Sequence, residues 1–380
     1  MFYFPFLHCL PADQRDSHKP GRRSVKGDLR DTLEALQKPA QCQPDSEALA
    51  NTLLGLTRFG RHDTSIIRVL AHAVVERINS SKPREVSNTL WALSTLGWYD
   101  SSVYDTLLVT LVDERNGQLD HQDLSHAIHS CAMASHGGSA VEKLGHVISK
   151  QDVSQEGGWS GQDLANSLYA WAVLNSIGIT SDSLTSMAQH LMREVNVRRF
   201  RAFQKPELAR LYPAHLEAER VGLLRGGLWG NGMVQAAEKE HKEHLERDRA
   251  KLSRGDAPGV QRAAAALQEA GYKVEFGGKV GRKLLPFFYT QLLVHRVLSV
   301  SNIAVDVPSG TDVFCHPPGQ LSGKARLKHA QIRAVIAEGR TSPGWRCDGF
   351  VVLSEGDTEQ PDLVVQKVEG EMKSYLEMQT

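Results

Sequence analysis

Two basic stretches have the composition that proteins use to hold a nucleic-acid strand. Residues 193–210 carry six Lys or Arg against two Glu, with aromatic side chains between the cations. Cations pair with phosphates and aromatic rings stack on bases, so this combination can bind single strands without strict sequence readout. The candidate RNA contacts here are Arg198, Arg199, Phe200, Arg201 and Phe203.

The second basic stretch, residues 320–346, carries six Lys or Arg against one acid. Its candidate RNA contacts are Lys324, Arg326, Lys328 and Arg333. For either stretch the alternative is a solvated helix face, which is what an isolated run of charges usually forms. The formal net charge of the chain is zero, so any attraction of a polynucleotide must come from such local patches.

Asp306 is a candidate metal ligand for an enzyme that cleaves RNA with a bound metal ion. A nuclease site needs clustered carboxylates and a Lys to hold Mg²⁺ and activate water. Residues 292–302 contain no Asp or Glu, no Glu-x-Lys follows Asp306, and Asp312 is a second candidate acid in a loop without an assigned place. We therefore predict no catalytic residue, no bound metal, no cofactor and no enzymatic activity.

Internal repeats in the first half of the chain predict the helices that would position the candidate RNA-binding residues there. Segments beginning at residues 50, 87, 125 and 165 share a helical apolar spacing, and a weak fifth begins at 209. Second helical stretches follow, and those at 63–79 and 100–116 both open with Asp, which favours a helix start. The repeating unit is a helix–turn–helix of about 38 residues, and stacked units of this kind form an α-solenoid with a long concave surface.

Two columns of the repeat could face a bound strand. The polar column contains Asn51, Asn88, His126 and Asn166, and the bulky column contains Leu54, Trp91, His129 and Tyr169. A one-base-per-repeat reader uses polar side chains at equivalent positions, which makes the polar column an RNA-binding candidate. For the polar column we favour the alternative in which Asn joins neighbouring repeats or serves the helix start, because a specificity code should vary and this column barely does. The bulky column varies more, but such a column more often serves packing, which is the alternative we favour for it.

The repeat resembles a known RNA-binding family. Residues 50–60 and 87–97, ANTLLGLTRFG and SNTLWALSTLG, are similar to the octotricopeptide repeat of organellar proteins, whose first helix reads close to A-N-T-L-W-A-L-A-x-L-G. The fourth copy also matches well, whereas the third has His126 for the Asn and Cys131 for a Leu. The resemblance covers residues 45–218 and implies passive binding of single-stranded RNA.

The last third of the chain predicts a small sheet with flanking helices. We expect strands at 272–276, 292–300, 303–307 and 348–353 and helices at 263–270 and 324–338. NIAVDVPSGTDVF, followed by a basic helix and GWRCDGFVVL, resembles a RAP domain. On this alignment Asp306, Phe314 and Trp345 take motif positions, and Pro-Ser-Gly at 308–310 replaces the usual Asp-Gly-Pro. The resemblance implies a restriction-endonuclease-like fold that binds RNA.

The predicted fold class is an α-solenoid of about four to five helix–turn–helix repeats followed by a small α/β domain. The predicted divisions, in chain order, are an N-terminal tail that is a transit segment or the remnant of an earlier repeat (1–44), octotricopeptide-like repeats (45–218), a linker and charged helix (219–260), a RAP-like domain (261–360) and a C-terminal tail (361–380).

Together the two resemblances imply an RNA-binding protein that acts in RNA processing, stability, translation or ribosome assembly, with ribonucleoprotein partners. They place it in a chloroplast or mitochondrion, with the chloroplast slightly favoured. Five scattered cysteines without a CxxC pair argue against structural zinc and fit a reducing compartment. No apolar run is long enough to span a membrane. The alternatives are a protein-interaction scaffold and a metal-dependent RNA endonuclease.

Overall fold

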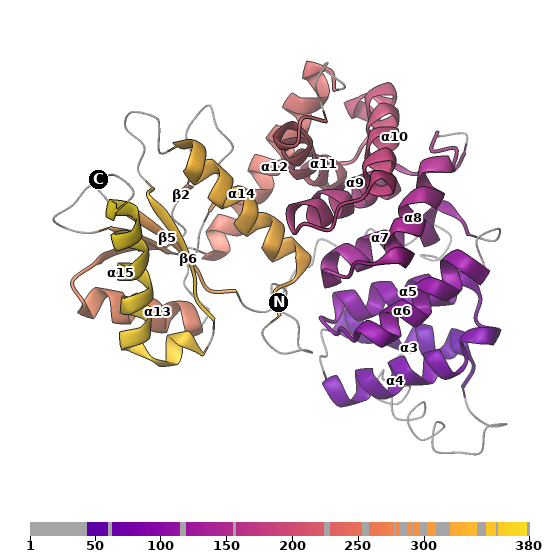
Figure 1. Ribbon diagram of the computed structural model, residues 1–380, viewed down its shortest axis with the longest axis horizontal. Helices are drawn as coiled ribbons and strands as arrows, with labels where there is room; N and C mark the ends of the chain where they lie inside the picture. Colours follow the sequence, from indigo (N-terminus) through magenta and orange to yellow (C-terminus); the bar gives the residue numbers. More distant parts are fainter. Residues whose placement is uncertain are drawn as a thin grey trace.

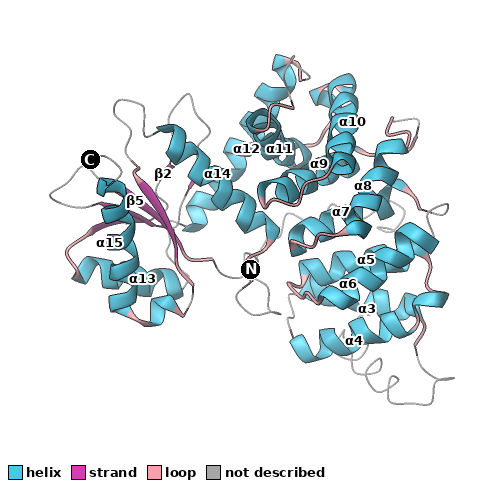
Figure 2. Ribbon diagram, in the orientation of Figure 1, coloured by secondary structure: helices cyan, strands magenta, loops and turns pink. Residues whose placement is uncertain are grey.

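The computed structural model describes residues 44–59, 63–114, 119–154, 157–223, 229–252, 258–276, 279–280, 288–289, 292–295, 302–308, 320–339, 347–354 and 356–377. Most of these residues are helical, and a small mixed sheet lies near the C-terminus (Figures 1 and 2). This confirms the predicted order of a helical array followed by a small α/β domain. The predicted N-terminal tail, residues 1–44, lies almost wholly outside the described residues.

The first helices of the five repeat copies form one layer, in which each helix packs on the next. They are α3 (Ser46–Phe59), α5 (Pro83–Thr95), α7 (His121–Ala134), α9 (Gly161–Ser176) and α11 (Lys205–Arg220). The second helices form a parallel layer, again in chain order. They are α4 (Thr64–Glu76), α6 (Ser101–Val109), α8 (Ser139–Lys150) and α10 (Asp182–Arg198).

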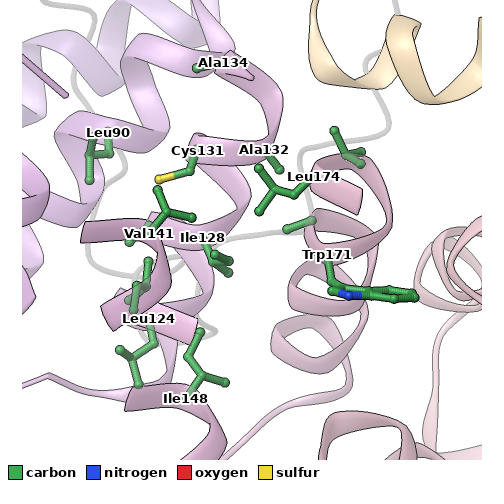
Figure 3. Close-up of a cluster of buried hydrophobic side chains, with 14 of the residues drawn as sticks. Leu90, Leu124, Ile128, Cys131, Ala132, Ala134, Val141, Ile148, Trp171 and Leu174 are labelled. Carbon is green, nitrogen blue, oxygen red and sulfur yellow. The ribbon is translucent and has the colours of Figure 1, made fainter. Parts of the chain in front are cut away.

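The repeated apolar positions form the seam between the two layers. Leu53, Leu90, Ile128 and Leu168 are all fully buried there. Figure 3 shows Leu90, Ile128 and Cys131 in one cluster with Val141 and Ile148 from the second layer. Neither layer alone could bury this surface, so burial of the shared seam holds each hairpin to its neighbours.

The second helices begin where the sequence predicts. The Asp63 carboxylate accepts hydrogen bonds from the backbone N–H groups of Ser65 and Ile66, and the Asp100 carboxylate accepts one from Val103. Both aspartates are therefore helix N-caps, which satisfy donors that have no partner inside the helix.

Helix α12 (Asn231–Leu252) extends the array, which corrects the predicted boundary at 218. It packs along α11, and Trp229, Met233 and Ala237 are buried in the same core as the repeats. His241 Nδ1 lies 3.1 Å from the backbone oxygen of Ala209. The segment is charged at most positions, which led us to predict a solvated helix, but its few apolar residues share one face and that face is buried.

The C-terminal domain is a four-stranded sheet in the order β1-β4-β5-β6. Among the strands that the structure describes, β5 and β6 are the one parallel pair. The strands are β1 (Lys273–Phe276), β4 (Leu292–His295), β5 (Asn302–Asp306) and β6 (Gly349–Val352), and a separate pair comprises β2 (Lys279–Val280) and β3 (Phe288–Tyr289). Each of the four sheet strands overlaps a predicted run, although β5 begins one residue earlier than predicted, and the short pair β2 and β3 was not predicted.

Helices cover both faces of this sheet, as alternation along the strands requires. Ile303 and Val305 contact α13 (Pro258–Glu269) and α15 (Pro361–Glu377) on one face. Ala304 contacts α14 (Gly323–Gly339) on the other. Val364, Val368 and Met372 of α15 are buried, so the domain continues to residue 377, and the predicted tail at 361–380 is largely a core helix.

Candidate nucleic-acid interface

One surface of the first-helix layer, which we call the first-helix face, combines the two columns that were weighed as RNA contacts. Helical spacing puts the polar column, the bulky column and a third column on one side of each helix, roughly opposite the buried seam. The third column contains Arg58, Thr95, Met133, Val173 and Glu217. The first-helix face is therefore directed away from the second helices, where it could meet a partner.

Exposure of the third column falls steadily along the array. In the third column Arg58 and Thr95 are exposed, Met133 is half-buried and Val173 is buried, while Glu217 is only 2% exposed. Along the third column the face is therefore open at the first two repeats and closed at the fourth and fifth.

The polar column follows the same gradient. Asn51 is exposed and Asn88 half-buried, whereas His126 is 7% and Asn166 0% exposed. The Arg210 guanidinium donates a hydrogen bond to Asn166 Oδ1, which joins α11 to α9. At the fourth repeat the column therefore joins neighbouring helices, as the favoured alternative expected, while Asn51 and Asn88 have accessible amides.

The bulky column forms a ladder of rings across three repeats. The Trp91 ring centroid lies 4.5 Å from that of His126 and 4.9 Å from that of His129, and His129 lies 6.4 Å from Tyr169. The rings of Trp91, His129 and Tyr169 are half-buried, so they pack on one another and still present edges or faces to the surface. A strip of partly exposed π-systems is the kind of surface on which nucleobases stack.

Two histidines in this ladder are uncharged at neutral pH. Burial lowers the pKa of His126 to about 4 and that of His129 to about 3. Neutral imidazoles supply stacking surface and hydrogen-bonding atoms but no cationic charge for phosphate. The ladder is therefore suited to bases, and any phosphate pairing must come from elsewhere.

A row of buried acids, which sequence analysis missed, holds the first helices in register. Glu85, Asp123, Asp163 and Glu207 occupy the third position of successive first helices and are 3% to 9% exposed. Each caps its own helix; for example, the backbone N–H of Lys82 donates to Glu85 over 3.0 Å and that of Gln204 donates to Glu207 over 2.7 Å.

Three of these acids also accept from the preceding repeat. Ser46 Oγ donates to Glu85 over 2.6 Å and Ser87 Oγ donates to Asp123 over 2.7 Å. His121 Nδ1 lies 3.0 Å from Asp163 Oδ2. The signal was present in the sequence, because each acid lies two residues before the start of a repeat copy, but an analysis of apolar columns passes over it.

Arg198, predicted as an RNA contact, has a largely buried side chain with a structural role. Its guanidinium donates to the backbone oxygens of Trp159 and Val153 over 2.6 and 2.7 Å and to Glu194 over 2.6 Å. Its side chain is only 6% exposed. Because all three guanidinium nitrogens are engaged, we correct the prediction and assign Arg198 to holding the end of α10.

The next three residues form an exposed basic turn (residues 199–201). Arg199 has φ of 59° and ψ of 160°, a backbone conformation that favours glycine. Phe200 is 39% exposed, and the Arg201 guanidinium lies 5.8 Å from the centre of its ring. Arg199, Phe200 and Arg201 can therefore reach a ligand. Phe203 does not qualify, because it is 7% exposed and packs in the repeat core.

The four basic candidates on α14 also divide into exposed side chains and side chains with partners inside the protein. Lys324 and Arg333 are exposed, and Arg333 lies over the Phe350 ring at 5.4 Å. Arg326 donates to the backbone oxygen of Leu321 over 3.3 Å. Lys328 forms an ion pair with Asp306, so we correct its assignment as an RNA contact.

Asp306 is a buried carboxylate whose negative charge is balanced by neighbouring side chains. It is 1% exposed, and Lys328 Nζ and His329 Nε2 both lie within 3.0 Å of it. Burial would raise the pKa of Asp306, but the charges and hydrogen bonds of Lys328 and His329 outweigh it and hold that pKa well below its usual range. In the described part of the chain no group of three or more His, Cys, Asp or Glu could hold a metal ion.

Phe314 and Trp345, the other two RAP-like motif positions, lie outside the described residues, as does Asp312. Each helix that the structure describes is too short or too polar to traverse a lipid bilayer. No protein-family model matches the chain. No curated protein matches it either.

Proposed function

We propose that this protein binds single-stranded RNA without cleaving it, through the first-helix face. The observation that carries the proposal is the ring ladder of Trp91, His129 and Tyr169, which runs from repeat to repeat beside the accessible amides of Asn51 and Asn88. Bases would stack on the ladder and meet the amides at their edges.

Phosphate contacts in this proposal come from the exposed cations. Arg199 and Arg201 lie on the basic turn, and Lys324 and Arg333 lie on α14. The chain has no net charge, so these local groups would supply the salt-dependent part of the affinity.

The finer assignments belong to the same proposal. We propose that the array is of the octotricopeptide type and the C-terminal domain a RAP domain, which supports a role in organellar RNA processing, stability, translation or ribosome assembly, in a chloroplast or mitochondrion. We do not propose RNA cleavage, because Lys328 and His329 already bind the Asp306 carboxylate that a catalytic metal ion would need. Sequencing the RNA that co-purifies with the tagged protein would name the compartment and the transcript.

Fluorescence anisotropy with an unstructured oligouridine across a salt series tests binding directly. We expect affinity to fall linearly with the logarithm of salt concentration. Trp91→Ala should weaken binding roughly tenfold, since a stacked base contributes about 1–3 kcal/mol. The matched control is Val69→Ala, an exposed position on the second layer.

The oligouridine must remain intact when Mg²⁺ or Mn²⁺ is added, and loss of substrate that Asp306→Ala abolishes would replace passive binding with nuclease activity. Absence of salt-dependent binding to any single-stranded RNA would leave the protein-interaction scaffold as the better account of the array.

A further inference from the structure

Helix α14 of the C-terminal domain lies across the first-helix face at the third to fifth repeats (Figure 1). Gln320, just before the helix, donates from Nε2 to the backbone oxygen of Ala134 over 3.2 Å. Gln331, in mid-helix, donates from Nε2 to the backbone oxygen of Pro213 over 3.2 Å. The helix therefore crosses the first-helix layer from α7 to α11.

The closest approach is made by Gly323 at the start of α14. A Cβ added there would overlap the backbone oxygen of Ala132 and lie 2.6 Å from Val173 Cγ1. Any side chain at this position would push the helix away from α7 and α9. The glycine thus allows backbone-to-backbone contact between the two domains.

The two sides of α14 belong to different cores. Ile332, Val335 and Ile336 pack on the domain's own sheet. Leu327 is 2% exposed and belongs to the core of the repeat array. A substitution at Leu327 therefore disturbs docking on the array while leaving the sheet-facing contacts of α14 in place.

Docking accounts for the burial of the third column at the fourth repeat. The third column becomes buried at Val173, directly beneath Gly323. In the polar column of the same face, Asn166 Nδ2 and His126 Nδ1 are buried and have no hydrogen-bond partner among the described residues. Unpaired polar atoms at a buried site cost free energy that a hydrogen-bonding ligand could recover.

From these contacts we infer that α14 is an intramolecular competitor for the first-helix face, so that RNA can extend past the second repeat only when the C-terminal domain undocks. This inference rests on the proposed RNA binding. Its physical basis is that one face cannot pack against a protein helix and a strand of nucleotides at once. A docked population of about 90–99% would weaken apparent affinity for a long strand roughly 10- to 100-fold.

Two full-length variants release the helix by different routes. Leu327→Asp places a charge in the repeat core, and Gly323→Leu creates the clash with Ala132. The matched control is Ala337→Asp, which adds the same charge at an exposed position of α14. Hydrogen exchange of α14 amides reports docking, and circular dichroism reports folding. Long and short oligouridines, the short one sized for the first two repeats, report binding.

We expect both release variants to bind long oligouridine at least tenfold more tightly than the wild type and the Ala337→Asp control, with little change for the short one. Increased α14 exchange with unchanged or weaker binding of the long strand would overturn the inference while leaving RNA binding intact. If neither the wild type nor any variant binds oligouridine, the proposed function itself fails. Agreement between the two variants excludes a folding defect peculiar to one of them.

Discussion

Lys328 Nζ lies 3.0 and 2.9 Å from the two carboxylate oxygens of Asp306, at the junction of α14 with the sheet. The ammonium side chain is 29% exposed and the carboxylate side chain 2% exposed, so this ion pair is anchored on a buried acid. His329 Nε2 contacts the same carboxylate at 2.9 Å. The pair ties the helix that docks on the repeats to strand β5.

Lys328→Met should destabilise the C-terminal domain. Removing one partner of a buried ion pair leaves an uncompensated charge, which costs about 3 kcal/mol in the free energy of unfolding. Lys324→Met, at an exposed position of the same helix, should change it by less than about 0.5 kcal/mol. Chemical denaturation followed by hydrogen exchange of β5 measures both, and equal stability of the two variants would contradict a structural role for the pair.

The repeat array should lose stability on acidification because of His126. Its folded pKa is about 4, below the ordinary value of 6.5, so between these two values the unfolded chain binds the proton more readily. Stability is therefore fully present above pH 6.5 and falls as pH decreases toward 4, by about 1.4 kcal/mol per pH unit once well below 6.5. His126→Gln should reduce this dependence in urea titrations but leave the part due to His129, whose pKa burial lowers to about 3, whereas His72→Gln, exposed on α4, serves as the control.

Hydrogen bonds from one repeat to the acid of the next should contribute measurably to stability. Ser87→Ala removes a hydroxyl that donates to the buried Asp123 and should cost about 1–2 kcal/mol. Thr52→Ala removes a hydroxyl that donates only to Ala48 in its own helix and should cost less than about 0.5 kcal/mol. Thermal unfolding of both variants makes the comparison, and similar melting temperatures would show that the acids act only as helix caps.

Two nearby arginines should separate stability from RNA binding. Arg198→Ala should lower stability by about 3 kcal/mol, because buried backbone oxygens and Glu194 lose their charged donor. Arg201→Ala should leave stability unchanged and weaken oligouridine binding, with a shallower salt dependence by roughly one phosphate contact. A binding defect confined to Arg198→Ala under fully folded conditions would reverse these assignments.

The repeat array and sheet could be predicted because their signals are local. Leu53, Leu90, Ile128 and Leu168 recur at helical spacing, and each is buried in the predicted seam. The boundary at residue 218 was wrong because α12 is dominated by charged side chains, which hide a short apolar stripe including Met233 and Ala237.

The candidate interface was harder to predict because it depends on contacts between distant parts of the chain. Nothing in a run of arginines distinguishes Arg198, whose partners include Val153 and Trp159, from the exposed Arg201. Docking of Gln320 on Ala134 joins residues far apart in sequence, and an isolated Gly at 323 has many ordinary explanations. Composition reveals where charged side chains and glycines lie in the sequence, but only the tertiary structure shows which of them already have partners inside the protein.

Gly323 also gives a genetic test that needs no purified RNA. Every other amino acid begins with the Cβ that the Ala132 oxygen excludes, so all missense changes at this codon should act in one direction. In a saturation screen for growth, their depletion would mean that the closed form is the working state in the cell. Their enrichment when expression of the protein is limiting would mean that docking of α14 reduces the activity of the protein in the cell.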